Sequence, residues 1–272
     1  MSTVLASNPR VIGIGEAHSL KGQSAIPATA TQFARRLLPK LAPRSSHLIL
    51  ELMAPNPECR KKNRAVRKAQ QPITKSHSLR AQHEYVTLGK VAKKLGIEPE
   101  LLKPSCQDLN AIANGGEGSM LVMLKTIVRL TREQVTAHRH SSPSAQPFTQ
   151  KSMIIAYGGA MHNDIEPRGG RAEFSFGPAL ADATDGAYVE LDLIVPEFIK
   201  STSTWTALPW YQHYDPEKFG DRAVLFQPSH NSFVLVLPLA AKPPAPALNA
   251  GTPSSTRPAK PPAHDQKASA LD

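Results

Sequence analysis

The strongest constraint on the fold comes from two apolar runs that each end in glycines and a histidine. The first reads Arg10-Val-Ile-Gly-Ile-Gly-Glu-Ala-His18, and the second reads Met153-Ile-Ile-Ala-Tyr-Gly-Gly-Ala-Met-His162. A run that is apolar at nearly every position is typical of a strand buried on both faces of a parallel sheet. Because ligands of open α/β sheets bind outside the carboxyl ends of the strands, we expect both histidines at one such edge.

The rest of the chain alternates between strand and helix patterns. Further strands are predicted at residues 47–53, 101–102, 186–195 and 233–238, and helices at 30–41, 57–69, 78–95 and 120–138. This alternation predicts the α/β class, with a mostly parallel central sheet flanked by helices. We expect one domain over residues 8–241. Residues 242–272 are rich in Pro, Ala and Ser without an apolar period, which predicts a disordered tail.

Acidic residues interrupt two of the predicted strands. Glu51 lies within the run 47–53, where a buried charge is costly unless it is paired. Glu51 is therefore either solvated at a strand end or part of the same sheet edge as Glu16. Glu190 and Asp192 alternate with apolar residues, a pattern that indicates a strand at the sheet edge with one solvated face.

The charge distribution and the two cysteines indicate which kinds of partner and compartment to expect. The net charge is +10, and the segment 58–80 holds eight Lys and Arg against one acid. We interpret this basic segment as a solvated face, since no aromatic residues are interleaved with it as in single-strand nucleic-acid binders. Cys59 and Cys106 lack a CxxC spacing and are interpreted as free thiols in a reducing compartment.

Membrane and secretion signals are missing from the printed sequence. No apolar run approaches the roughly 18 residues that a membrane span needs, and the first residues lack a basic region followed by an apolar one. We therefore expect a cytoplasmic protein without a membrane span.

Two kinds of site fit the glycine and histidine stretches. Gly13 and Gly15 begin a dinucleotide fingerprint, but His18 stands where the third glycine belongs, so a nucleotide site is disfavoured. Histidines and carboxylates can instead hold a divalent metal. The same atoms without a metal can form a His–Glu pair that activates water.

Three short motifs resemble one known superfamily. Gly15-Glu-Ala-His18 resembles the GExH motif, and Gly159-Ala-Met-His162 the GxxH motif, of the Tiki/TraB, ChaN-like and erythromycin-esterase-like superfamily. Leu-Ile-Leu-Glu51 resembles its Glu-bearing second strand. The resemblance spans about residues 10 to 240 and is closest to the ChaN-like haem-binding uptake branch, from which the chain departs by lacking a signal peptide and a lipobox cysteine.

The resemblance implies a hydrolase-like enzyme that cleaves an ester or amide bond. Glu16, His18, Glu51 and His162 would line the site. His18, Glu51 and His162 would hold a divalent metal (Mn, Co or Zn), or the histidines would activate water while the glutamates orient them.

The same resemblance implies an alternative, a non-enzymatic haem- or iron-binding protein. Tyr157 or one of the histidines, such as His162, would then be an axial ligand of the iron. Asn163 and Asp164 would support the site in either case. The expected partner is a small-molecule or peptide substrate, or haem, and not a nucleic acid.

Overall fold

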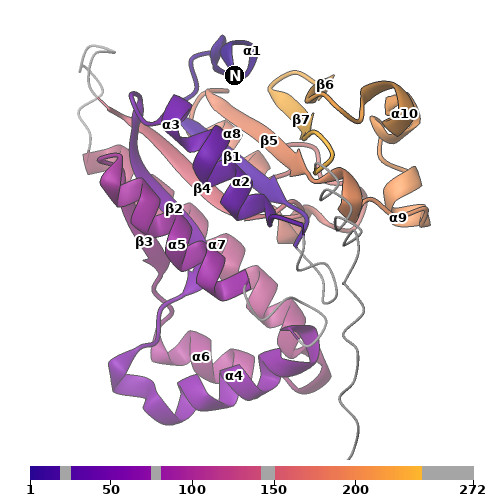
Figure 1. The fold of residues 1–272 in the computed structure, drawn as a ribbon. Coiled ribbons are helices and arrows are strands. Elements are labelled where there is room, and N and C mark those ends of the chain that lie inside the picture. Colours follow the sequence, from indigo (N-terminus) through magenta and orange to yellow (C-terminus); the bar gives the residue numbers. More distant parts are fainter. Residues whose placement is uncertain (19–25, 75–80, 142–150, 241–272) are drawn as a thin grey trace, which may run out of the picture. The chain divides into compact units, whose positions relative to one another are not determined.

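A seven-stranded sheet forms the centre of the protein. The computed structural model describes residues 1–18, 26–74, 81–141 and 151–240. The strands follow the order β3-β2-β4-β1-β5-β7-β6, and every neighbouring pair is parallel except β6 with β7 (Figure 1). Their bounds are β1 Val11–Glu16, β2 Ser45–Met53, β3 Glu98–Leu102, β4 Met153–Gly159, β5 Tyr188–Ile194, β6 Val224–Ser229 and β7 Ser232–Val236. The predicted α/β class is confirmed, and the predicted tail 242–272 lies outside the described residues.

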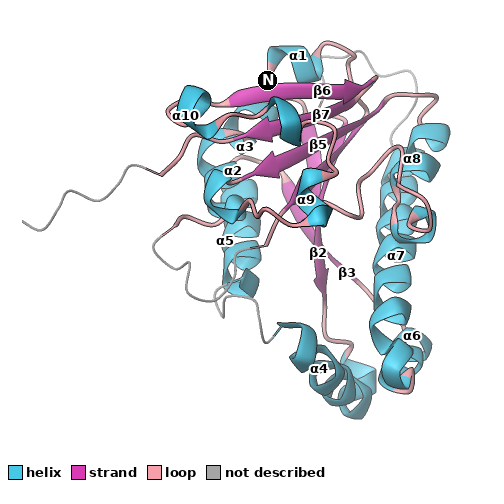
Figure 2. Ribbon diagram, turned by 90° about the vertical axis from the view of Figure 1, so that its right-hand side faces the viewer, coloured by secondary structure: helices cyan, strands magenta, loops and turns pink. Residues whose placement is uncertain are grey.

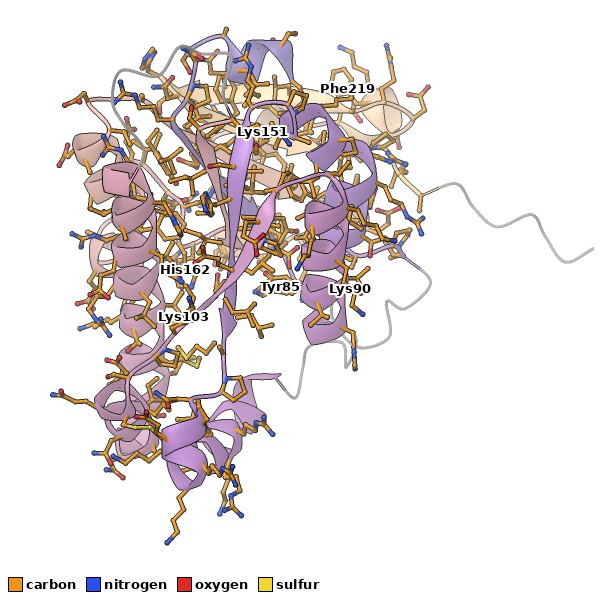
Figure 3. All side chains as sticks on the ribbon, turned by 90° about the vertical axis from the view of Figure 1, so that its left-hand side faces the viewer. Tyr85, Lys90, Lys103, Lys151, His162 and Phe219 are labelled. Carbon is orange, nitrogen blue, oxygen red and sulfur yellow. A yellow bond between two sulfur atoms is a disulfide. The ribbon has the colours of Figure 1, made fainter. Side chains whose placement is uncertain are left out.

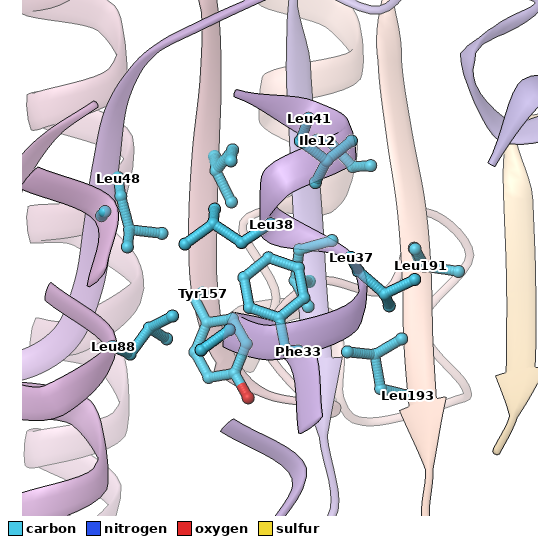
Figure 4. Close-up of a cluster of buried hydrophobic side chains, with 14 of the residues drawn as sticks. Ile12, Phe33, Leu37, Leu38, Leu41, Leu48, Leu88, Tyr157, Leu191 and Leu193 are labelled. Carbon is cyan, nitrogen blue, oxygen red and sulfur yellow. The ribbon is translucent and has the colours of Figure 1, made fainter. Parts of the chain in front are cut away.

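Helices cover both faces of the sheet. α2 (Thr29–Arg36), α3 (Leu38–Leu41) and α5 (Ala81–Lys94) lie on one face, and α7 (Ser119–Ser141) and α8 (Gly177–Ala183) on the other (Figure 2). The first interface holds the larger core, in which Phe33, Leu88 and Tyr157 are buried (Figure 4). The remaining helices are α1 Ser2–Leu5, α4 Arg60–Thr74, α6 Cys106–Ala113, α9 Ser203–Thr206 and α10 Pro216–Phe219.

The helix predicted at 30–41 is divided into α2 and α3 at Leu37. Pro39 explains the break, because proline has no N–H for the helical hydrogen bond and its ring collides with the carbonyl of the preceding turn. The basic helix predicted at 57–69 is confirmed in kind, as a 3-10 turn at Pro57–Cys59 followed by α4.

The predicted set lacked α6 and β6, as well as the short helices α1, α8, α9 and α10. α6 begins at a capping box, in which the Ser105 hydroxyl accepts from the Asp108 N–H and the Asp108 carboxylate accepts from the Ser105 N–H. These two hydrogen bonds fix the start of α6 at Cys106. β6 is the antiparallel edge strand, and Pro228 near its end suits an edge position.

The edge position predicted for the strand at 186–195 is wrong. β5 lies inside the sheet between β1 and β7, and Glu190 is only 6% exposed. The alternation of acidic and apolar residues was interpreted as a solvated face, yet Glu190 is buried and Asp192 is half-buried. Hydrogen bonds from the Ile165 N–H to Glu190 and from Asn163 to Asp192 replace water around them.

The prediction of free thiols is also wrong, because Cys59 and Cys106 form a disulfide. The lack of a CxxC spacing excludes only a pairing of cysteines that are close in sequence. Packing of α4 on α6 brings these distant cysteines to a Cα separation of 5.7 Å. Free thiols therefore no longer support the prediction of a cytoplasmic location, since structural disulfides are typical of oxidising compartments. Within the described ranges, none of the helices has both the length and the apolar character needed to cross a bilayer.

Candidate functional site at the carboxyl edge of the sheet

The carboxyl ends of β1, β2 and β4 bring the four predicted site residues to one edge of the sheet. Glu16 ends β1 and pairs in register with Gly159 at the end of β4. Glu51 lies near the end of β2, on the other side of β4. His18 and His162 follow β1 and β4 by two and three residues. Parallel pairing therefore gathers residues that are more than a hundred positions apart in the chain.

Glu16 is a buried carboxylate that three side chains hold in place. It is 7% exposed, and it accepts hydrogen bonds from His18 Nδ1 at 2.9 Å and from the Tyr85 hydroxyl at 3.1 Å. The Tyr157 hydroxyl donates to its other oxygen. Such a saturated carboxylate is suited to orient His18 rather than to react itself, since its oxygens already have donors.

Glu16 also keeps a proton on His18. Burial alone would lower the pKa of His18, but the hydrogen bond and the charge of Glu16 outweigh it and raise the pKa to about 9. Glu51 and Glu84 add to this rise through their charges. At neutral pH, His18 is therefore an imidazolium, a form that donates protons and stabilises negative charge.

His162 forms the second histidine–carboxylate pair, with Glu51. Its Nδ1 lies 2.7 Å from the Phe174 carbonyl oxygen, and a carbonyl can only accept, so Nδ1 carries a hydrogen. Its Nε2 lies 3.4 Å from Glu51 Oε1, while Glu51 Oε2 accepts from the Gly159 N–H at 2.7 Å. In the neutral ring, Nε2 therefore points a lone pair at the Glu51 carboxylate, and a hydrogen-bond donor or a cation can lie between the two.

The two pairs face each other across Gly159. A Cβ on Gly159 would lie 3.4 Å from His18 Nε2 and 3.8 Å from both Glu51 Oε2 and His162 Cδ2. At Gly158 a Cβ would overlap the Glu51 carboxylate. The second predicted glycine stretch thus keeps the backbone open between the reactive groups. Figure 3 shows Tyr85 and His162 approaching this edge from opposite faces of the sheet.

Tyr157, predicted as a haem ligand, is packed in the core beneath Glu16. It is 2% exposed, and its ring lies 5.0 Å from that of Phe33 and 5.4 Å from that of Tyr85, centroid to centroid. Its hydroxyl group supports Glu16. Axial ligation of an iron would require the side chain to leave this packing, so the haem role of Tyr157 stays a prediction.

Acidic and histidine groups that can hold a metal ion are present, but the trio predicted from sequence is not one of them. In the described ranges, two sets offer three ligand atoms within 4.8 Å of one another. They are His47 with Glu100 and His138, and Asp164 with Glu190 and Asp192. Metal binding by His18, Glu51 and His162 therefore remains a prediction.

A cluster of three carboxyl groups, Asp164, Glu190 and Asp192, lies close to His162 in the fold. Asp164 was expected to support the site, whereas Glu190 and Asp192 were predicted on a solvated strand face. Asn163 Nδ2 donates to Asp192 at 3.0 Å, and the Ile165 N–H donates to Glu190 at 2.8 Å. Burial raises the pKa of Glu190 to about 7, that of Asp164 to about 6, and that of Asp192 well above its usual range. These contacts fix the chain that follows His162.

The sequence carried a signal for this cluster. Gly13 and Gly15 pair in register with Glu190 and Asp192. A Cβ on Gly15 would overlap the Asp192 carboxylate, and a Cβ on Gly13 would overlap the Tyr188 hydroxyl. The alternate glycines therefore make room for one acidic and one tyrosine side chain from the neighbouring strand. Tyr85, a site residue that was not predicted, had no signal, because nothing in α5 marks the distant carboxylate that it contacts.

A pocket of about 410 Å³ lies at the end of β2. Leu52, which follows Glu51 in the chain, lines it, whereas Glu16, His18, Glu51 and His162 do not. Its walls come from the end of β2, from β3 and from the helix pair α4 and α6. Most of its lining is apolar, with Asn63 and Arg67 as the polar members; the other lining residues are Leu52, Met53, Ala54, Pro55, Val66, Leu101 and Leu109. The pocket is thus suited to an apolar group with a polar or anionic end.

We expect Glu16→Gln to bring the pKa of His18 down from about 9 toward its ordinary 6.5, because the charge that raises it is lost. Since the raised pKa stabilises the fold below pH 6.5 and this contribution is lost as pH rises through 9, wild-type stability should fall over that window. The stability of the Glu16→Gln variant should change less with pH over the same window. NMR titration of the His18 ring and urea melts at several pH values measure both; an unchanged pKa in the variant would contradict the pairing.

Comparisons with known proteins leave the superfamily open. No protein-family model matches the chain, and no curated protein matches it. A solved succinoglycan biosynthesis protein is similar with a TM-score of 0.38 and 8% identity, over 88% of this chain and 89% of that one. A protein from Bacillus cereus gives a TM-score of 0.37 and 10% identity, over 84% and 88%. Similarity this weak carries no argument about function.

Proposed function

We propose that this chain is a hydrolase-like enzyme that cleaves an ester or amide bond with Glu16, His18, Glu51 and His162. The proposal rests on one observation: two histidine–carboxylate pairs face each other across Gly159. One pair holds a proton at neutral pH and the other presents a ring nitrogen beside a carboxylate. A proton donor opposite a proton acceptor is the arrangement that general acid–base hydrolysis requires.

The roles follow from the protonation states. Glu51 and the Nε2 of His162 take a proton from water, and the water oxygen forms a bond to the carbonyl carbon. The imidazolium of His18 stabilises the developing oxyanion and then gives its proton to the leaving alkoxide or amine, so that the carbon–oxygen or carbon–nitrogen bond breaks. Glu16 keeps His18 oriented and charged. The proton count balances, because one proton enters the His162–Glu51 pair as one leaves His18.

The same residues can also be considered as ligands of a divalent metal. If Mn, Co or Zn is bound, His18, Glu51 and His162 would hold it, and the ion would polarise the carbonyl and the water. His18 would first have to lose the proton that Glu16 holds up to a pKa of about 9. That cost favours the metal-free roles for His18.

The substrate is proposed to be a small molecule or peptide with an apolar group. The pocket beside Glu51 is lined mainly by apolar side chains, and Arg67 and Asn63 can bind a carboxylate or carbonyl at its wall. A partner of this kind fits the pocket better than a nucleic acid, because the lining supplies no stacked aromatic platform.

The test is a matched pair of glycine variants assayed on a panel of aryl esters and anilides. Gly159→Ala places a methyl between His18 and Glu51, whereas Gly169→Ala meets nothing within 4 Å. We expect wild type and Gly169→Ala to hydrolyse some members of the panel, and Gly159→Ala to lose at least tenfold in kcat/KM. The methyl would make ordinary contacts with His18 and Glu51 at 3.4 and 3.8 Å, and it would occupy the space between them where the reacting atoms of the substrate have to lie. No turnover by wild type, or equal turnover by both variants, would refute the site.

Two further arms of the same experiment address the alternatives. Dialysis against a chelator followed by addition of Mn, Co or Zn tests the metal, and loss and recovery of turnover would assign one. Titration with hemin tests the haem alternative, for which a Soret band that disappears in His162→Asn would be needed. We expect no such band, because both candidate ligands are buried: the Tyr157 hydroxyl is bonded to Glu16, and His162 Nδ1 to the Phe174 carbonyl.

A further inference from the structure

We propose that His47, Glu100 and His138 form a second site, which binds zinc or a similar divalent transition metal. The three residues come from β2, β3 and α7, and their ligand atoms lie within 4.8 Å of one another. His47 lies four residues before Glu51 on β2, so the two sites are roughly 13 Å apart along the strand. This site is independent of the proposed hydrolytic one.

The side chains already converge on one point. The rings of His47 and His138 are stacked, with centroids 3.9 Å apart and planes inclined by 23°. His138 Nε2 lies 2.8 Å from Glu100 Oε1. Imidazole lone pairs lie in the plane of the ring, so the two rings have to turn out of the stack before both can contact one ion. The ligand atoms already lie within 4.8 Å of one another, so rotations about the side-chain bonds are enough to bring both rings and the carboxylate to that ion.

Hydrogen bonds around the site orient two of the three ligands. The Ser46 hydroxyl donates to the Met153 carbonyl at 3.3 Å, so its oxygen accepts from His47 Nδ1 at 2.9 Å. His47 Nε2 is therefore left without a hydrogen in the neutral ring, which is the form that binds metal. Gln134 Nε2 donates to Glu100 Oε2 at 3.4 Å. Outer contacts of this kind are typical of histidine and carboxylate metal ligands.

The ligand set points to the chemical class of the ion. Two imidazoles and one carboxylate are a known zinc set, and imidazole also suits Cu and Ni, whereas Mg and Ca prefer oxygen ligands alone. All three residues are partly exposed, so a water can complete a tetrahedron. The ion would take the place of the proton that His138 shares with Glu100. Bound there, it would fasten the C-terminal part of α7 to β2 and β3.

The rival explanation is a stacked histidine pair closed by an ion pair without metal. Such a cluster would be unaffected by zinc, whereas a metal that binds only the folded protein stabilises it by mass action. The two explanations differ in stoichiometry and in which variants lose the response.

The experiment is titration of the metal-stripped protein with ZnCl₂ by calorimetry, with thermal melts in parallel. Wild type and His162→Asn should bind one zinc at this site and melt at a higher temperature with zinc, while His47→Gln and His138→Gln should lose that equivalent and the shift. Glu100→Gln, which can still bond to His138, should weaken binding at least tenfold. Melts without zinc show whether each variant folds.

Other results would overturn the proposal. Wild type that binds no zinc at micromolar concentrations would do so, as would binding that survives in His47→Gln and His138→Gln, or that is lost only in His162→Asn. If one of the glutamine variants fails to fold, the other and Glu100→Gln decide. Turnover of the ester panel should not change in His47→Gln, His138→Gln or Glu100→Gln. A failure of the zinc site and a failure of the proposed hydrolase function are therefore separate results.

Discussion

Replacing His162 by asparagine is expected to lower kcat/KM for the ester or amide substrate by ~10²–10⁴-fold, the usual contribution of a positioned acid or base. Asparagine keeps an N–H near the position of Nδ1, which donates to the Phe174 carbonyl at 2.7 Å, so the buried acceptor stays bonded. It removes Nε2, the atom beside Glu51. The loss should therefore appear in turnover and not in the urea midpoint.

His18→Asn should cause a loss of similar size for the complementary reason. Its amide can still donate to Glu16, but it has no proton to give to a leaving group. If the two histidines act in one step, the double variant should be little worse than either single one, because residues that act as a unit are not additive. His230→Asn, at an exposed position, is the matched control. Turnover that survives in both single variants would remove the acid–base assignment.

The position of the candidate site could be predicted because it depends on two general features of the sequence. One is the local strand pattern, and the other is the parallel pairing of the strands. Apolar runs ending in glycines marked β1 and β4 without any distant information. Parallel pairing then places all carboxyl ends at one edge, which led us to expect Glu16, His18 and His162 together. Glu51 was left open between this edge and a solvated strand end, and only the observed order β2-β4-β1 makes it a neighbour of the others. The finer geometry, such as the bond from the Gly159 N–H to Glu51, depends on register and could not be predicted.

The residues that were misjudged are those whose surroundings come from distant regions of the chain. Glu190 and Asp192 alternate with apolar residues just as a solvated edge strand would, and only the position of β5 inside the sheet distinguishes the two cases. Tyr85 looks like any core aromatic until Glu16 is placed beside it. The break at Pro39, in contrast, was readable from the chain itself, since a proline inside a helical pattern predicts a kink.

Reduction of the Cys59–Cys106 disulfide is expected to destabilise the protein by about 4 kcal/mol, the chain-entropy value for a loop of this length. The cysteines are 47 residues apart, and the bond links the start of α4 to the start of α6. The apolar cluster around it is small, with Val66, Leu109 and Ile112 as its other buried members. With so little buried surface, the helix pair depends on the crosslink more than the sheet does.

Reduction should change both the stability of the protein and its binding of substrate. Dithiothreitol should lower the urea midpoint of the wild type and leave a Cys59→Ala/Cys106→Ala variant unchanged, and that variant should resemble the reduced wild type. Because Val66 and Leu109 line the pocket beside Glu51, reduction should also raise KM for substrates with an apolar group while kcat falls less. Two thiols titratable in the native oxidised protein would contradict the bond. An unchanged KM despite a lowered midpoint would instead separate the pocket from the hydrolytic site, since the helix pair would then have no role in binding the substrate.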